Sequence, residues 1–269
     1  MLNIAVAFFG IPRNSQICFP SIEENVLAQL PPDSNVKCFY HLYKIDEVQN
    51  SRSGERGERG ELEADNYQVF ESMTGLLAST DGVLDRWDFD RVKALGDTWA
   101  DDFASLRNLI YQLNSLHAVT TMMESFNPDF VVFVRPDIFY HTPLPAYVFK
   151  HPEARRRNIY IPDWQWWGGL NDRFAICGRD TYVAYGKRIE RIFDFCTATG
   201  RKLHSERLLK FVLQQAGAKV CTVDTTASRV RINGAFAEES FSPKRNMGKR
   251  ENRYFHFFAR LRTFRDKQR

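Results

Sequence analysis

The chain has 269 residues, of which 43% are hydrophobic and 26% charged, and its formal net charge is +4. This composition excludes a disordered, collagen-like or membrane-spanning protein. A chain of this length buries roughly 70–75% of the surface that its unfolded form exposes. It therefore needs no disulfide bond or structural metal to fold. No window has the ~20 consecutive apolar residues of a membrane-crossing helix, and no signal peptide opens the chain, so we expect a soluble, cytoplasmic protein.

The five cysteines are odd in number, widely spaced and without a C-x-x-C pair. Such a pattern favours buried, reduced thiols over a disulfide framework or a zinc site.

The positive charge is concentrated at the C-terminal end. Residues 244–269 carry +8, which leaves −4 for the preceding part of the chain. Aromatic residues alternate with these cations, a composition compatible with docking at an anionic membrane surface or with nucleic-acid binding. A solvated helix laid across the core by its aromatic side chains is an equally good interpretation. We therefore expect one domain over residues 1–242 and a basic aromatic tail over 243–269.

Apolar runs alternate with helical patterns along the chain, which predicts an α/β fold with a mostly parallel sheet flanked by helices. Strands are predicted at 4–9, 36–43, 130–134, 158–161, 173–177 and 219–223. Helices are predicted at 18–30, 102–126, 180–197 and 205–216. The continuous apolar run at 130–134 is typical of a central strand covered on both faces. The polar, glycine-rich segment 50–66 has no apolar period and is predicted to be a mobile loop.

The sequence contains no P-loop, G-x-G-x-x-G, G-x-S-x-G or H-E-x-x-H motif, so several common enzyme classes lose support. Open α/β sheets bind ligands beyond the carboxyl ends of their strands, where loops far apart in the sequence line one crevice. After the first predicted strand, Gly10 permits a close backbone approach and Arg13 can contact a phosphate ahead of a helix. A tight turn with a surface arginine explains this segment equally well.

The central strand ends in Arg135-Pro136-Asp137. A charged pair at this position must reach solvent, pair internally or bind a ligand, because burying an unpaired charge is costly. In the functional interpretation, Asp137 coordinates a divalent cation on a diphosphate or hydrogen-bonds a sugar, while Arg135 neutralises negative charge. The structural alternative is an internal salt bridge between the two side chains.

The segment 163–172 contains three tryptophans, Trp164, Trp166 and Trp167, and ends in Asn171-Asp172. Indole rings near amides and carboxylates suit sugars, whose C–H faces pack on the rings while their hydroxyls take hydrogen bonds. One or two of the rings can equally belong to the core. Asn171 and Asp172 either form a turn or present a carboxylate to an acceptor.

His204, Ser205 and Glu206 open the last predicted helix. Ser205 suits the N-cap, and the helix dipole alone explains an acid in the first turn. Alternatively, His204 contacts substrate, or His204 or Glu206 accepts the proton of an attacking hydroxyl as a general base.

These motifs form an ordered series over about residues 3–225, namely 10–13, 50–55, 108–116, 130–137, 169–175 and 204–206. The series resembles the GT-A-type nucleotide-sugar glycosyltransferases of bacterial and large-virus polysaccharide synthesis. The resemblance implies a GT-A-like, Rossmann-like domain that uses a nucleotide-diphosphate sugar as donor. It also implies donor binding by the first-strand loop and by Arg52, with Asp137 in the place of the last acid of the D-x-D metal motif.

On the acceptor side, the resemblance implies that Glu206 and Asp172 recognise the acceptor or act as the base. The acceptor would be the hydroxyl of a glycan or of a lipid-linked sugar. An inverting enzyme requires such a base, whereas a retaining enzyme requires none.

The chain departs from the GT-A pattern at the metal motif. Arg135 stands where the first acid of D-x-D would be, and a guanidinium cannot bind a metal. Either Asp137 holds Mn²⁺ or Mg²⁺ with help from phosphates and water, or Arg135 replaces part of the charge of the metal.

The leading hypothesis is a glycosyltransferase of surface polysaccharide synthesis whose basic tail makes a peripheral membrane contact near lipid-linked acceptors. The alternative is a non-catalytic nucleotide-sugar or carbohydrate-binding protein of the same fold. Nucleic-acid binding ranks last, because the body of the chain is acidic.

Overall fold

The computed structural model describes residues 1–45, 48–50, 55–60 and 65–243. Arg52 and the basic tail from residue 244 onward lie outside the described residues, so donor binding by Arg52 and membrane contact by the tail stay predictions.

A seven-stranded sheet forms the centre of the molecule, with the strand order β10-β8-β9-β6-β1-β2-β5. Its strands are β1 (Asn3–Gly10), β2 (Asn35–Tyr43), β5 (Thr74–Ala78), β6 (Phe130–Val134), β8 (Asn158–Pro162), β9 (Ala175–Gly178) and β10 (Lys219–Val223). Only β9 runs against its neighbours in this sheet; the other pairs are parallel. The prediction of an α/β fold with a mostly parallel sheet is confirmed.

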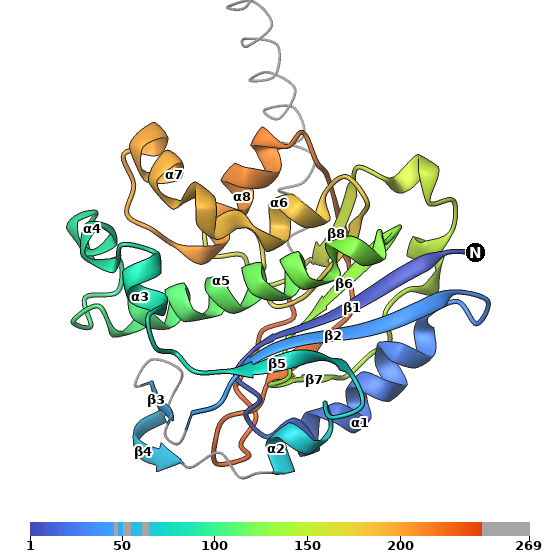
Figure 1. Cartoon of the computed structure of the whole chain (residues 1–269), viewed down its shortest axis with the longest axis horizontal. Coiled ribbons are helices and arrows are strands. Elements are labelled where there is room, and N and C mark those ends of the chain that lie inside the picture. The colour runs from blue at the N-terminus through green and yellow to red at the C-terminus, as the bar shows by residue number, and fades with distance from the viewer. Residues whose placement is uncertain (46–47, 51–54, 61–64, 244–269) are drawn as a thin grey trace, which may run out of the picture.

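Helices cover both faces of the sheet because its inner strands are apolar on both sides (Figure 1). On β1, Ala5, Ala7 and Phe9 face one hydrophobic layer and Ile4, Val6 and Phe8 face the other. The first layer contains α5 (Ala104–Met123), α6 (Tyr182–Gly186), α7 (Ile192–Thr199) and α8 (Ser205–Gln215). The second contains α1 (Ser15–Asn25) and the antiparallel ribbon of β7 (Ile138–Tyr140) and β11 (Ala227–Arg229).

The central strand is placed as predicted. All five residues of β6 are buried, and the strand lies between β1 and β9. The long helix α5 also matches its apolar stripe, since Leu106, Ile110 and Leu113 are fully buried on it. Its predicted stripe residue His117 is instead half-buried and contacts Glu190 at 2.8 Å.

Other boundaries differ from the prediction for local reasons. The predicted helix 180–197 is broken into α6, a 3₁₀ turn at Arg188–Arg191 and α7. Arg188 is fully buried at the break and donates a hydrogen bond to the carbonyl of Tyr185. The predicted helix 18–30 begins earlier, and α1 ends at Asn25 before a 3₁₀ turn at Leu27–Gln29.

The segment 50–66, predicted to be a mobile loop, contains regular structure in its described part. An antiparallel ribbon of β3 (Val48–Asn50) and β4 (Glu55–Gly60) occupies it, followed by α2 (Asp65–Gln68). Short elements without a clear hydrophobic period were also not predicted: α3 (Val83–Arg86), α4 (Phe89–Ala94), β5, β7 and β11.

In the described part of the chain, no helix combines the length and apolar character needed to cross a membrane. All five cysteines are free, and Cys18, Cys177 and Cys196 are buried.

Candidate functional site

The polar segments singled out in the sequence meet at one edge of the sheet. Residues 10–13 follow β1 and residues 135–137 follow β6, which are neighbouring parallel strands. β9 is antiparallel to β6 and pairs Ala175 with Phe133, so residues 171–173, which precede β9, lie at the same edge. This edge holds the carboxyl ends of the parallel strands, where open α/β sheets bind ligands.

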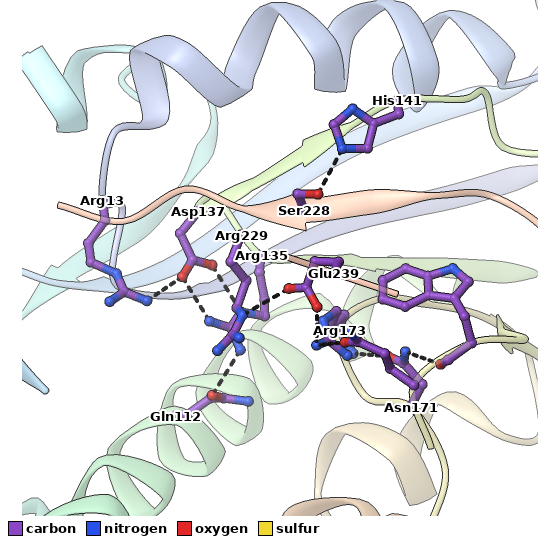
Figure 2. Close-up of polar contacts among 12 residues, drawn as sticks. Arg13, Gln112, Arg135, Asp137, His141, Asn171, Arg173, Ser228, Arg229 and Glu239 are labelled. Atoms are coloured by element: carbon purple, nitrogen blue, oxygen red, sulfur yellow. Dashed lines mark hydrogen bonds and ion pairs between the residues drawn. The ribbon is translucent and has the colours of Figure 1, made fainter. Parts of the chain in front are cut away.

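Asp137 is a buried carboxylate held between two guanidinium groups. Its Oδ2 accepts hydrogen bonds from Arg13 at 2.6 Å and from Arg135 at 2.8 Å. Its Oδ1 accepts a third, from Nε of Arg135, at 3.0 Å. Arg135 also donates to Oε1 of Gln112 on α5, at 3.3 Å (Figure 2). The internal salt bridge between Arg135 and Asp137, which was the structural alternative for this segment, is therefore present. Arg13 also pairs with Asp137.

Burial alone would raise the pKa of Asp137, but the charges of Arg135 and Arg13 outweigh it and hold that pKa well below its usual range. The same pairing raises the pKa of Arg135 although burial opposes the shift. Asp137 is thus ionised at all physiological pH values and is matched by more than one positive charge.

The surroundings of Asp137 do not fit a divalent cation. Both of its oxygens already accept hydrogen bonds from guanidinium groups, and the charges of Arg13 and Arg135 repel a metal ion. Within the described ranges, no group of three or more His, Cys, Asp or Glu side chains is placed to hold a metal. The assignment of Asp137 as the ligand of Mn²⁺ or Mg²⁺ is therefore not supported by its geometry.

A second buried carboxylate, Glu239, bridges two further arginines (Figure 2). Its Oε2 lies 2.9 Å from a terminal nitrogen of Arg173, and its Oε1 lies 3.3 Å from Nε of Arg229. Burial lowers the pKa of Arg173, Glu239 opposes that shift, and the charges of Arg229 and Arg135 add to it. Arg173, Arg229 and Arg135 therefore lie within electrostatic range of one another.

We call Arg13, Arg135, Arg173 and Arg229, with Asp137 and Glu239, the arginine cluster. Figure 2 shows two networks, Arg13 and Arg135 around Asp137 and Arg173 and Arg229 around Glu239, and the charge of Arg135 acts on Arg173. Four guanidinium groups here face two carboxylates, an excess of two positive charges. The side chains of Arg135 and Arg229 remain 17% and 34% exposed, so the excess is accessible to a ligand. Such a cluster attracts an anion with several oxygens.

Asp172 lies beside the arginine cluster and joins it to α8. Its Oδ2 is 3.5 Å from the fully buried Arg188 and accepts a hydrogen bond from the hydroxyl of Ser205. Ser205 is therefore not the N-cap that the sequence suggested. His204 occupies the N-cap position, and the Ser205 hydroxyl donates its hydrogen bond to Asp172 instead. The side chain of Asp172 remains 15% exposed.

Glu206, in the first turn of α8, is almost completely buried. Burial raises the pKa of its carboxyl from 4.5 to about 8, and the nearby charge of Asp172 adds to that shift. One of its oxygens accepts a hydrogen bond from the backbone N–H of Trp167. Glu206 thus fastens the tryptophan segment to the start of α8 and carries a proton at neutral pH.

Glu206 is expected to make stability depend on pH. Because its pKa is raised from 4.5 to about 8 in the folded state, its stabilising contribution is complete below pH 4.5 and lost as the pH rises through 8. Glu206→Gln mimics the protonated acid. Between pH 5 and 8.5 the wild-type free energy of unfolding should fall by on the order of 2 kcal/mol more than that of the variant. Urea unfolding at both pH values measures this, and parallel pH dependences would contradict it.

The three tryptophans have different surroundings. Trp164 is fully buried, and its Nε1 donates to the carbonyl of Thr225 at 2.9 Å. Trp166 is half-buried and donates to the carbonyl of Pro162 at 2.7 Å, whereas Trp167 is 64% exposed. The structure therefore makes Trp164 a core residue and corrects its assignment to substrate binding.

Asn171 is likewise a structural residue. It is fully buried, its Nδ2 donates to the carbonyl of Trp164 at 2.8 Å and its Oδ1 accepts from the backbone of Arg173 at 3.0 Å. Because both ends of its amide have partners inside the protein, the turn interpretation holds and the substrate-binding assignment is corrected.

The first-strand loop turns at Gly10, which has a φ of +102° that favours glycine. The N–H of Gly10 donates to Oγ of Ser115 on α5, and the N–H of Ser15 at the start of α1 donates to Asn66. The amides of Gly10 and Ser15 therefore have acceptors within the protein.

His204 lies apart from the arginine cluster, in a surface hollow that it shares with Trp166, Trp167 and Arg207. Its ring stacks on Trp99, with ring centres 5.7 Å apart and an interplanar angle of 29°. His204 thus contributes to a wall of this hollow.

No family model matches the sequence, and no curated protein matches it. Among solved structures, mouse xyloside xylosyltransferase 1 in its apo form is similar over 83% of this chain and 86% of that one. The TM-score is 0.40 and the sequence identity is 8%. A similarity of this size assigns no activity or ligand to this chain.

Sequence reasoning did not single out Gln112, Arg229, Glu239, Trp99 or Arg207 as site residues. Arg229 lies on the short strand β11, and Glu239 comes after it in a segment without regular structure. Neither position has a motif around it: the pairing of β11 with β7 places Arg229, and the N–H of Ala237, which donates to the carbonyl of Arg229, brings the chain back beside it.

Proposed function

We propose that this chain is a glycosyltransferase that binds the diphosphate of a nucleotide-diphosphate sugar at the arginine cluster. The observation that carries the proposal is the excess of two guanidinium groups at the carboxyl edge of the sheet. A diphosphate linked to a nucleoside and a sugar carries about two negative charges, which this excess matches. The position supports a nucleotide-type ligand, because such ligands bind at this edge of open α/β sheets.

Arg135 and Arg229 are the guanidinium groups most open to the diphosphate. Planar guanidinium groups bind phosphate oxygens through paired hydrogen bonds. In this proposal they supply the positive charge that a divalent cation provides in D-x-D enzymes. Asp137 then keeps Arg13 and Arg135 in place and does not contact a metal.

The sugar is proposed to move to an acceptor hydroxyl with Asp172 as the general base. The acceptor oxygen attacks the anomeric carbon, the bond from that carbon to the diphosphate oxygen breaks, and Asp172 takes the hydroxyl proton. The arginine cluster stabilises the negative charge that develops on the leaving diphosphate. Asp172 suits the base better than Glu206, because Asp172 is the more exposed of the two and the Glu206 carboxyl is protonated at neutral pH.

Donor binding tests the proposal. In a thermal-shift panel of UDP-, GDP-, dTDP- and CMP-sugars, at least one donor is expected to raise the Tm of the full chain. Arg229→Gln should weaken its binding by about tenfold or more, since one charge-assisted contact to phosphate is lost. The matched control is Arg156→Gln, an exposed arginine that pairs with Asp180 at the opposite edge of the sheet.

The same titrations with Mn²⁺ and with a chelator test the role of the arginines. The affinity for the donor should change by less than about threefold between them, because no metal bridges protein and phosphate in this proposal. A strict requirement for the metal would contradict it. Tight binding without donor cleavage over hours would overturn the transferase assignment and leave a sugar-nucleotide-binding protein.

A further inference from the structure

An open hollow of about 440 Å³ lies over the start of α8, between the tryptophan segment and the loop before α5. Its lining includes three indole rings, one imidazole and one guanidinium, from Trp99, Trp166, Trp167, His204 and Arg207. The volume falls in the range of roughly 300–1,000 Å³ that small-molecule sites occupy. The hollow is separate from the arginine cluster, so donor phosphates do not explain it.

The aromatic walls of this hollow are fixed by hydrogen bonds. The Asp97 carboxylate accepts three backbone N–H groups of the loop, from Trp99 at 2.8 Å and from Asp101 and Phe103 at 3.0 Å each. On the other wall, the Glu206 carboxyl holds the backbone of Trp167. The exposed ring of Trp167 is therefore presented to solvent by an anchored backbone.

Arg207 gives the hollow a positive charge. Its Nε is buried and has no hydrogen-bond partner among the residues that the structure describes. This nitrogen would lie only 3.4 Å from a side-chain carbon added at Gly168, so the glycine leaves room for the guanidinium against the tryptophan segment. Because Arg207 lines the hollow, its guanidinium group is placed to pair with an anionic group of a ligand.

We infer that this hollow binds the acceptor and that the acceptor is a saccharide bearing a carboxylate, an inference that rests on the proposed glycosyltransferase function. The indole rings pack against the C–H face of a sugar, and Arg207 pairs with its carboxylate. The hollow is connected to the proposed base, because Glu206 holds Trp167 and lies within electrostatic range of Asp172. Trp167 is thus joined through Glu206 to the start of α8, where the neighbouring Ser205 donates a hydrogen bond to Asp172.

The test is a calorimetric titration of the full chain with a disaccharide containing glucuronic acid. The comparison ligand is the same disaccharide with its carboxylate reduced to an alcohol. The wild-type protein should bind the acid at least tenfold more tightly than the reduced sugar. Arg207→Gln should remove this preference, and Trp167→Ala should weaken the binding of both sugars by about tenfold. Control variants are Arg191→Gln and Phe236→Ala, an exposed arginine and an exposed aromatic residue outside the hollow.

Equal affinity of the wild-type protein for both sugars would overturn the acidic character of the ligand. Absence of binding by either sugar, or an unchanged affinity in Trp167→Ala, would overturn the assignment of the hollow. Donor binding, measured by thermal shift on the same variants, should be unchanged. If no nucleotide sugar binds even to the wild-type protein, the proposed function fails, while the two disaccharides still decide whether the hollow is a saccharide site.

Discussion

Replacing Asp172 by asparagine is expected to lower the rate of sugar transfer by about 100-fold or more, because a positioned general base contributes about 10²–10⁴-fold. The asparagine keeps an oxygen that can accept the hydrogen bonds of Ser205 and Arg188 but cannot take the acceptor proton. Donor affinity should stay within about threefold of the wild-type value, since the phosphates contact the arginine cluster. Initial rates at saturating donor and acceptor, together with a donor titration, measure both quantities.

Asp180→Asn is the matched control for this variant. Asp180 is an exposed aspartate that also pairs with an arginine, Arg156, but at the opposite edge of the sheet. Its rate of transfer should equal that of the wild-type protein. An Asp172→Asn enzyme with an unaltered rate would show that the reaction needs no base at this position, as in a retaining mechanism.

Replacing Asp137 by alanine is expected to lower the free energy of unfolding by about 3–5 kcal/mol, because two guanidinium groups lose the carboxylate that compensates them in a buried site. The exposed pair of Arg156 and Asp180 should contribute about 0–1 kcal/mol by comparison. Urea unfolding at pH 7 measures the loss of stability in Asp137→Ala and in a variant that removes the carboxylate of Asp180. Losses of similar size at the two sites would contradict the structural role of Asp137.

Two further measurements separate this role from a general loss of packing. Adding Arg135→Gln to Asp137→Ala should recover part of the stability, because it removes one of the uncompensated charges. The contribution of Asp137 should also depend on pH. Its pKa is lowered in the folded state, so the stabilisation is present above pH ~4 and is lost as the pH falls through the folded pKa.

The stabilising role of Asp137 changes how loss of activity in its variants is interpreted. An inactive Asp137→Ala protein would not identify a metal ligand, because the substitution also disturbs Arg13 and Arg135. Arg229 is the better probe of donor binding. Its side chain is the most exposed of the arginine cluster, and its partner Glu239 also pairs with Arg173.

The positions along the chain of six strands of the main sheet, and the edge at which the polar segments lie, could be predicted from the sequence. The run at 130–134 is apolar at every position, which is typical of a strand covered on both faces. Once this strand and β1 are parallel neighbours, the residues that follow them must share an edge. The broken helix at 182–199 could not be predicted, because the break depends on the burial of Arg188 near Asp172.

The sequence by itself determined the α/β architecture, the central strand and the position of Arg135 and Asp137 at its end, because these follow from hydrophobic period and local turn chemistry. Only the tertiary structure decided which charges pair. Asp137 is bound by Arg13, 124 residues away, and Glu239 joins Arg173 to Arg229. Tertiary burial also distinguished Trp164 in the core from the exposed Trp167. Charge pairing and solvent exposure depend on distances between segments remote in the chain, which no local pattern of residues encodes.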